Sequence, residues 1–297
     1  MNFFRVNPDL LGGANLTGNG GYTRYNSVQI DVTKRFSHGL QFQGGYVYGV
    51  ALASNRYSFR TPYRESLDTG DEGGITHAFK GNWVYELPFG SGRKFLGNSG
   101  GFVDRLVGGW SFDGVARITT GRLLDFGNVR VVGMSVDELR RSIKLQEFAV
   151  TGLNADARTL LYVMPKDIVE NTVRAFSTSA TSTSGYGSLG PPTGRYLAPA
   201  NGPDCIEPDT EGDFGDCGVN RLEVTGPRYV RFDLSAVKRV KISGRLTFEF
   251  RGEMLNAFNH PNFEPVISTT NNADNYRVTS LQENSSRIVQ LVWRASW

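Results

Sequence analysis

The chain has 297 residues, a formal net charge of +3 at pH 7 and a mean hydropathy of −0.31. The small charge, without a basic cluster, argues against nucleic acid as a partner. No run of about 18 apolar residues occurs, which excludes a transmembrane helix. The 36 glycines and the aromatic content of 12% are typical of long strands, tight turns and interfacial aromatic belts.

Seven segments alternate apolar and polar residues with the period of two that is characteristic of a β-strand. In the first, Val28, Ile30 and Val32 share one face, and Gln29 and Asp31 share the other. The segments cover about residues 22–36, 40–50, 75–87, 110–119, the two halves of 228–254 on either side of Ser243-Gly244, and 287–297. We therefore predict an all-β protein with about seven long antiparallel strands.

The two segments within residues 228–254 are the most informative. Val230 and Phe232 alternate with Arg231 and Asp233, and the same pattern resumes after the turn. Strands in soluble proteins usually have about 5–6 residues, and these are each roughly twice as long. A tilted strand needs about 9–11 residues to cross a bilayer. Because lipid offers no hydrogen-bond partners, such strands must belong to a closed barrel, so we predict an antiparallel transmembrane β-barrel segment.

The lengths of the connections predict the orientation of the strands. Outer-membrane barrels have short periplasmic turns, longer extracellular loops and a last strand that descends to the periplasm. The predicted extracellular loops are about residues 51–74, 122–226 and 257–286. The predicted periplasmic connections are His38-Gly39, about residues 88–109, and Ser243-Gly244. Lys34 and Lys238, on otherwise apolar faces, then lie near strand ends, where their long side chains can reach polar surroundings.

The two faces of the predicted sheet carry different side chains. Aromatic residues cluster at the predicted periplasmic boundary, as in the aromatic girdle of a membrane interface. They are Phe36, Tyr85, Phe89, Trp110 and Trp297. The opposite face carries charges that either line a substrate path or pair with one another across strands. These are Asp31, Glu86, Arg117, Arg231, Asp233, Glu249, Arg251 and Glu253.

The connection of residues 122–226 is too long for a plain loop and contains helix signals. Ser135 and Glu138 form a capping box ahead of an apolar run. Pro165 can occupy the first position of a second helix that continues to Phe176. The Ser/Thr tract of residues 177–184 and the following Pro191-Pro192 predict flexible chain. We expect a folded, partly helical extracellular cap with a mobile tail.

Cys205 and Cys217 lie close together in a polar loop, which favours a disulfide in an oxidising compartment, with two unpaired thiols as the alternative. The same loop is acidic, and its oxygen ligands suit calcium, although the spacing is not that of an EF-hand. The candidate calcium ligands are Asp209, Glu211, Asp213 and Asp216. A solvated acidic loop is the alternative. No other cofactor is predicted.

No enzymatic site is predicted. Residues 185–190 match GxGxxG by letter, but they follow a Ser/Thr tract and run into Pro191, so neither the strand nor the helix of a dinucleotide site is expected. His38, His77 and His260 are scattered, and none is near a cysteine or a nucleophile. A catalytic triad or a histidine metal cluster therefore has no support.

Four segments resemble TonB-dependent outer-membrane receptors, most closely the Oar-like group, whose members carry an N-terminal carboxypeptidase-regulatory-like domain. They are YNSVQIDVTKRFSHGLQFQGGY (25–46), ELPFGSGRKFL (86–96), DRLVGGWSFDGVARITTGR (104–122) and GPRYVRFDLSAVKRVKISGRLTFEFRGEMLNAFNHPNF (226–263). The resemblance covers nearly the whole chain and is most specific around residues 253–259 and at the terminal Trp297.

The resemblance implies a 22-stranded barrel with an N-terminal plug and a TonB box. The sequence accounts for about seven strands and for neither plug nor box, so we predict that residues 1–297 are the C-terminal third of such a receptor, with residues 122–226 as a loop insertion. The N-terminus lacks a signal-peptide pattern, which agrees with truncation. The resemblance also implies that the terminal residues, with Trp293 and Trp297, are read by the barrel-assembly machinery.

We expect a receptor of the Gram-negative outer membrane. In the intact protein, extracellular loops would capture an unidentified ligand, lipid would surround the barrel, and TonB would act through the missing N-terminal part. The alternative is a non-transporting, adhesin-like protein in which the loop of residues 122–226 binds a partner and the barrel serves as an anchor. A secreted soluble β-sandwich is a third hypothesis.

Overall fold

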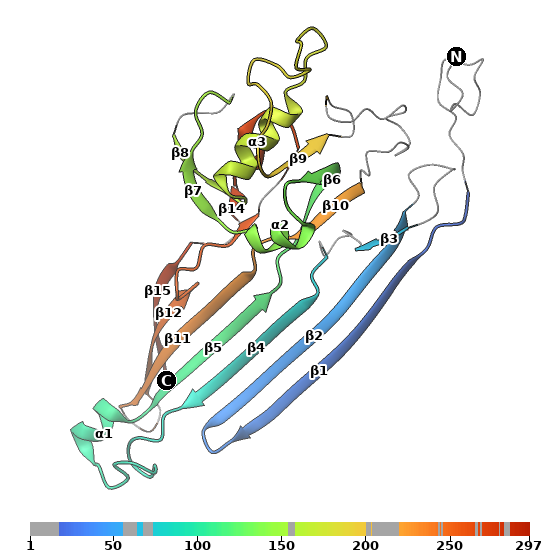
Figure 1. The fold of residues 1–297 in the computed structure, drawn as a ribbon. Coiled ribbons are helices and arrows are strands. Elements are labelled where there is room, and N and C mark those ends of the chain that lie inside the picture. Colours follow the sequence, from blue (N-terminus) through green and yellow to red (C-terminus); the bar gives the residue numbers. More distant parts are fainter. Residues whose placement is uncertain are drawn as a thin grey trace.

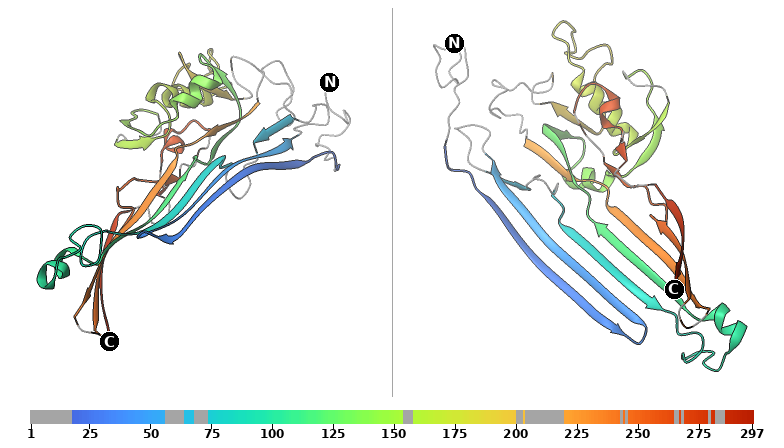
Figure 2. Two further views of the ribbon diagram at one scale, coloured as in Figure 1. Left: turned by 90° about the horizontal axis from the view of Figure 1, so that it is seen from below. Right: turned by 180° about the vertical axis from the view of Figure 1, so that it is seen from behind.

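A computed structural model describes residues 18–55, 64–67, 74–153, 158–199, 203, 220–242, 244, 246–264, 267, 269–278, 280–281 and 286–297. Figure 1 shows two parts: a layer of long antiparallel strands, and a smaller folded cap at one end of that layer. A short helix, α1 (Gly101–Val107), lies at the opposite end. The two further views in Figure 2 show the strands as one curved layer with the cap and α1 at its two ends.

The main sheet confirms the predicted long strands and their order. Its path is β1-β2-β4-β5-β11-β12-β15, and every neighbouring pair is antiparallel. The strands are β1 (Thr23–Ser37), β2 (Leu40–Asn55), β4 (His77–Glu86), β5 (Trp110–Thr119), β11 (Tyr229–Lys241), β12 (Thr247–Leu255) and β15 (Ile288–Ser296). The short β3 (Arg64–Leu67) pairs with the end of β2. Among the described residues, β1 and β15 do not pair, so the sheet is open.

The register gathers the apolar residues of all these strands on one face of the sheet. One row joins Ile30, Tyr46, Phe79, Ile118 and Val230, each directly opposite the next on the neighbouring strand. Residues directly opposite in antiparallel strands share a face. Large side chains of this face are exposed, including Ile30 at 55% and Leu291 at 84%. The face therefore has the character of a surface that contacts lipid, which we call the apolar face.

Glycines on the apolar face let aromatic rings lie against the backbone. A Cβ atom at Gly44 would stand 2.6 Å from the Phe42 ring, and one at Gly114 would collide with the Trp83 ring. Real Cβ atoms essentially never approach so closely. These positions therefore need glycine, because Phe42 and Trp83 occupy the space of the missing side chains.

Both lysines of the apolar face reach polar groups at the strand ends, as predicted. The Nζ of Lys34 donates hydrogen bonds to the backbone oxygens of Ser37 (2.9 Å) and Leu40 (3.2 Å). The Nζ of Lys238 donates to the backbone oxygens of Leu106 (3.0 Å) and Gly108. The charges are thus kept at the end of the sheet where α1 lies, and the centre of the apolar face stays apolar.

The cap is built from two of the predicted extracellular loops, residues 122–226 and 257–286, and not from residues 122–226 alone. A small sheet joins β10 (Asn220–Thr225), β6 (Leu123–Val132) and β9 (Tyr196–Pro199). The other elements are α2 (Val136–Ser142), β7 (Gln146–Ala149), β8 (Thr159–Tyr162), α3 (Lys166–Phe176), β13 (Phe263–Glu264), the 3-10 helix η1 (Ala273–Tyr276) and β14 (Ser280–Leu281).

The hydrophobic core lies in the cap and not on the main sheet. Leu139 of α2, Ile168 of α3 and Tyr276 of η1 are fully buried in one cluster. The Tyr276 hydroxyl donates to the Thr270 carbonyl (2.8 Å) and accepts from the Thr270 N–H (2.9 Å). Burial raises the pKa of Tyr276 above its ordinary value, and the hydrogen bond with the Thr270 backbone opposes that shift. The segment after β12 therefore completes the hydrophobic core of the cap, most of which comes from residues 122–226.

The helix signals of the cap are confirmed, whereas the predicted mobile tail is wrong. The Ser135 Oγ accepts from the Glu138 N–H (3.1 Å), and the Glu138 carboxylate accepts from the Ser135 N–H (2.9 Å). Pro165 is the N-cap of α3, so the helix begins at Lys166, one residue later than predicted. The residues after α3 form a folded turn, in which the Gly187 N–H donates to the Ser177 carbonyl and Arg174 donates to the Leu189 carbonyl. Backbone pairing and helix contacts therefore order this polar segment.

Among the described residues, no helix has both the length and the apolar character needed to span a bilayer.

The first prediction tests the two faces at adjacent positions of β11. Leu234 lies on the apolar face between Gly114 and Met254, and Ser235 lies on the other face between Asp113 and Glu253. We expect Leu234→Arg to destabilise the membrane-inserted protein by about 2–4 kcal/mol, the cost of a cation at the bilayer midplane. Ser235→Arg, between two carboxylates, should be tolerated. Unfolding by urea in phospholipid vesicles measures both, and equal losses would contradict the assigned faces.

Candidate functional site

The predicted disulfide and calcium ligands cannot be placed. Cys205, Cys217 and the candidate ligands Asp209, Glu211, Asp213 and Asp216 lie outside the described residues. Both ideas stay predictions. Within the part of the chain that the structure describes, no three His, Cys, Asp or Glu residues gather in an arrangement that could hold a metal ion.

The three histidines occupy unrelated places in the fold. His38 lies in the turn after β1, with a φ of 54°. His77 begins β4, and its Nδ1 is 2.8 Å from the Tyr46 hydroxyl. His260 belongs to the segment after β12. Residues 185–190, the GxGxxG match, lie in the turn after α3 and lead into extended chain, so no helix follows them.

The most site-like feature is a pocket of about 320 Å³ where the polar face of the main sheet meets the cap. It is lined by Ile75 before β4, by residues from Arg117 at the end of β5 to Asp125 in β6, by residues 226–229 at the start of β11, and by Asn262, Phe263 and Ile267 after β12. Its charged lining residues are Arg117, Arg122, Arg228 and Asp125, and its other polar lining residues include Thr119, Thr120, Tyr229 and Asn262. The sequence did not indicate this pocket, because its residues come from four separate segments.

Arg117 is one of three arginines that line this pocket. It stands directly opposite Lys80 on β4 and Arg231 on β11, so three cations form one row across the polar face. Its guanidinium carbon is 5.2 Å from the centre of the Tyr229 ring, a cation–π contact. Like charges directly opposite each other on a sheet are destabilising. On the other side of Lys80 the row continues with Gly45 of β2, over which the Asp31 carboxylate lies.

The neighbouring cation Arg231 is already compensated. Its Nε donates to both oxygens of Asp233, at 2.9 and 3.0 Å. Elsewhere on the polar face, Arg239 bonds Glu249 directly across the strands (2.8 Å), and Arg251 contacts Glu253 two residues along β12 (3.3 Å). The predicted charge pairing is therefore confirmed for Arg231, Arg239 and Arg251. Lys80 and Arg117 differ, because no described carboxylate lies within 4.0 Å of either cation.

The carboxylate in the pocket is compensated from the cap. Asp125 Oδ2 accepts from Arg221 Nη2 (2.7 Å) and Nε (3.1 Å), and Asp125 Oδ1 accepts from the Gly127 N–H (2.9 Å). Partial burial alone would raise the pKa of Asp125, but the hydrogen bonds from Arg221 and Gly127 outweigh it and hold that pKa below its ordinary value. Asp125 stays ionised and bound to Arg221, and three arginines line the same pocket.

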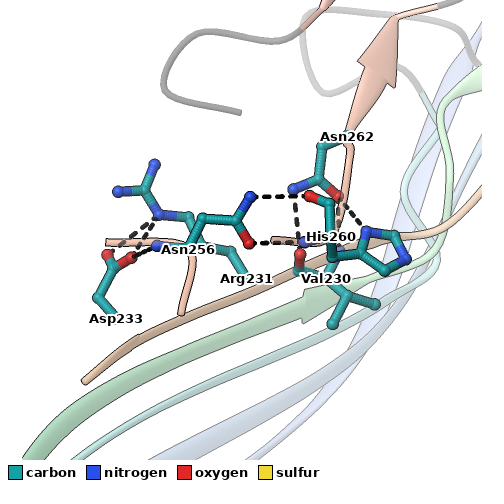
Figure 3. Close-up of polar contacts among 6 residues, drawn as sticks. All are labelled: Val230, Arg231, Asp233, Asn256, His260 and Asn262. Atoms are coloured by element: carbon teal, nitrogen blue, oxygen red, sulfur yellow. Dashed lines mark hydrogen bonds and ion pairs between the residues drawn. The ribbon is translucent and has the colours of Figure 1, made fainter. Parts of the chain in front are cut away.

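A polar corner lies where β11 meets the segment after β12 (Figure 3), and one of its residues, Asn262, also lines the pocket. The side chain of Asn262 accepts from the Val230 N–H and donates to the Val230 carbonyl, both at 3.0 Å, as a neighbouring strand would. The Asn256 side chain closes the turn by donating to the His260 carbonyl (2.9 Å) and accepting from the His260 N–H (3.0 Å). Asp233 accepts from the Asn256 N–H (2.8 Å).

This corner explains the specific sequence around residues 253–263 in structural terms. Asn256 has a φ of 48°, a backbone conformation that asparagine tolerates well, and it is 1% exposed. Asn262 is equally buried and also lines the pocket. The corner therefore holds the chain that enters the cap against β11, beside Tyr229 and Arg117.

Comparison with known proteins agrees with this geometry. Residues 2–290 match the family model described as "Outer membrane beta barrel domain". The chain belongs to this family. No curated protein and no solved structure matches it. Membership places the chain in the outer membrane, and it identifies the apolar face as the surface toward lipid and the polar face as the surface toward the barrel interior.

Trp293 and Trp297, the two residues predicted as an assembly signal, lie at the C-terminal end of the chain, and Trp293 is on the apolar face of β15. Trp293 packs in parallel with Phe248 (ring centres 6.0 Å apart) and with Phe250 (6.5 Å). Trp297 is 92% exposed. Recognition of these side chains by the assembly machinery stays a prediction.

The second prediction concerns the pH dependence of the Asp125–Arg221 pair. Because the pKa of Asp125 is lowered in the folded state, its stabilising effect is complete above the unfolded pKa of about 3.9 and is lost as the pH falls through the folded value. Asp125→Asn should therefore lower the temperature at which protease begins to cleave the cap at pH 7, and the difference from the parent protein should shrink as the pH falls below about 3.9.

A matched control is Asp137→Asn, which removes an exposed pair with Arg140 and should change little at either pH. Protease protection of the detergent-solubilised protein, read by mass spectrometry after an acid pulse, reports the difference. An Asp125→Asn effect that persisted unchanged at pH 2 would contradict the ionic origin of the stabilisation.

Proposed function

We propose that the chain forms the C-terminal wall and part of the ligand-capturing surface of a TonB-dependent, Oar-like receptor. The observation that supports this best is the open sheet whose polar face leads into a pocket beneath a folded cap. Among the described residues, the outer edges of β1 and β15 have no partner strand, and such edges cannot persist in lipid because their N–H and C=O groups would lack partners. We therefore propose that further strands complete the barrel, as in a large receptor.

The pocket indicates which ligands the proposed receptor would favour. Arg117, Arg122 and Arg228 line it, and Asp125, the one carboxylate among its described lining residues, is compensated by Arg221. Arginine binds carboxylate and phosphate groups through paired hydrogen bonds. An anionic ligand that enters beneath the cap would thus meet the cationic row of Lys80 and Arg117 on the barrel interior. Transport past this point would use the plug and TonB, which act through the N-terminal part of such receptors.

The adhesin-like alternative is favoured by a different observation. The cap has its own hydrophobic core of buried residues and would present a rigid surface to a partner without any transport. The two functions differ in their dependence on TonB and on the interior pocket, and this difference can be measured.

The third prediction compares the depletion of anionic compounds from defined medium by cells of the native host. We expect compounds that the parent strain removes to remain in the medium of both a TonB deletion and an Arg117→Ala strain, because import needs energy and the pocket cation. The control Arg239→Ala changes an interior arginine that is paired with Glu249 and lies outside the pocket, and it should leave depletion intact.

Surface binding is followed separately, with the same compounds on chilled cells. A receptor should still bind them when TonB is deleted. Depletion that is unchanged in the TonB deletion and lost with the receptor gene would contradict transport and favour the adhesin-like function.

A further inference from the structure

The connection between β4 and β5, at the predicted periplasmic end of the sheet, exposes several large apolar side chains. The helix α1 has no buried residue, and Phe102, Val103 and Leu106 are 78%, 50% and 62% exposed. At helical spacing these three side chains lie on one side of α1. Phe95 and Leu96, just before the helix, are also exposed. Together these five residues form the apolar rim.

Side chains of the lipid-facing surface hold α1 in place. Trp110 and Lys238 are directly opposite each other in the row at the periplasmic end of the apolar face. The Trp110 indole N–H donates to the Leu106 carbonyl (3.1 Å), and Lys238 Nζ donates to the same carbonyl and to that of Gly108. The carboxyl end of α1 is thus fastened to the lipid side of the barrel wall, not to its interior. Figure 1 shows the helix beyond the ends of β4 and β5.

The connection that carries the apolar rim is folded, so the exposure of these residues is not that of a loose loop. The Gly90 N–H donates to the Phe95 carbonyl (3.0 Å), and the Phe95 N–H donates to the Pro88 carbonyl (2.9 Å). The Phe89 and Phe95 rings are 5.5 Å apart. The Asp104 carboxylate accepts from the Ser91 N–H, which ties the helix to the preceding turn.

Cationic side chains border the apolar rim. Lys94 lies 5.5 Å from the Phe95 ring centre, and Arg105 is exposed beside Leu106. Asp104 is engaged with Ser91, and Arg93 is paired with Glu86. Apolar side chains on one side and Lys or Arg beside them are the features of a helix that lies in the membrane interface, where cations contact lipid phosphates.

We propose that the apolar rim inserts into the periplasmic leaflet of the outer membrane and anchors the barrel wall to phospholipid, with Lys94 and Arg105 at the headgroup phosphates. Continuity with the lipid-facing surface, through Trp110 and Lys238, argues for lipid as the occupant in place of a periplasmic protein. The proposal depends on the location of the chain in the outer membrane and is independent of whether the barrel imports a ligand.

The fourth prediction tests this insertion with an environment-sensitive label on a cysteine at position 102. The full protein, with Cys205 and Cys217 replaced by Ser, carries Phe102→Cys and is reconstituted into vesicles of phosphatidylcholine and phosphatidylglycerol. Leu291→Cys, on the lipid face of β15, is the positive control, and Gln43→Cys, on the interior face of β2, is the negative control. A shift in gel mobility on boiling confirms that each labelled protein is folded.

We expect brominated lipid to quench the label at position 102 as strongly as the label at 291, and aqueous iodide to quench neither. Quenching of the label at 102 by iodide alone would overturn the proposal, because the apolar rim would then face the periplasmic solution. Quenching by neither agent would also overturn it, since another part of the protein would then cover the apolar rim.

A second variant tests the cationic border. Lys94→Gln combined with Arg105→Gln should reduce lipid quenching at position 102 in vesicles that contain phosphatidylglycerol and have little effect in pure phosphatidylcholine. A loss that is equal in both vesicles would contradict the role given to the phosphate contacts.

Discussion

The absence of hydrogen-bond partners in lipid is the constraint on which this structure depends. Each strand of the main sheet pairs along most of its length with its neighbours, so that backbone groups are satisfied within the layer. This pairing fixes the register, and the register places every apolar row on the same face. Since that face is turned to lipid, its side chains stay exposed and cannot make a core. The buried core accordingly lies in the cap, where water drives apolar groups together.

The same constraint decides where charge is allowed. On the apolar face, Lys34 and Lys238 both bend to backbone carbonyls at the end of the sheet where α1 lies. The opposite face can carry many ions because it faces the barrel interior. There most described charges pair locally, and the row of Lys80 and Arg117 stands out next to the pocket. The buried corner formed by Asn256 and Asn262 holds the start of the loop of residues 257–286 beside this row. The cap therefore meets the polar face of the sheet at this point.

The sequence predicted the main sheet well because strand period and turn position are local signals. Residues such as Val230 and Arg231 alternate regardless of what surrounds them, and the capping box of Ser135 and Glu138 is equally local. The cap strands were missed, although Leu124, Phe126 and Val129 are apolar, because short strands carry weak periodic signals. The role of Tyr276 could not be predicted, since its burial depends on partners more than a hundred residues earlier in the chain, such as Leu139.

The pocket was unpredictable for the same reason, as Arg117, Asp125 and Asn262 meet only through tertiary contacts. The segment of residues 177–192 after α3 shows the opposite error, in which order was missed where flexible chain was predicted. Its composition is typical of flexible chain, yet hydrogen bonds to Ser177 and the contact of Arg174 with Leu189 order it.

The size of the native protein in its own membrane tests the central proposal, a wall segment of a larger barrel, most directly. Outer-membrane fractions would be immunoblotted with antibody to the cap, with and without boiling. We expect a band well above the 32.7 kDa of this chain, found only in the outer membrane and shifted by boiling. A band of 32.7 kDa in that membrane would contradict the large receptor, and the same band in the soluble fraction would contradict the barrel itself.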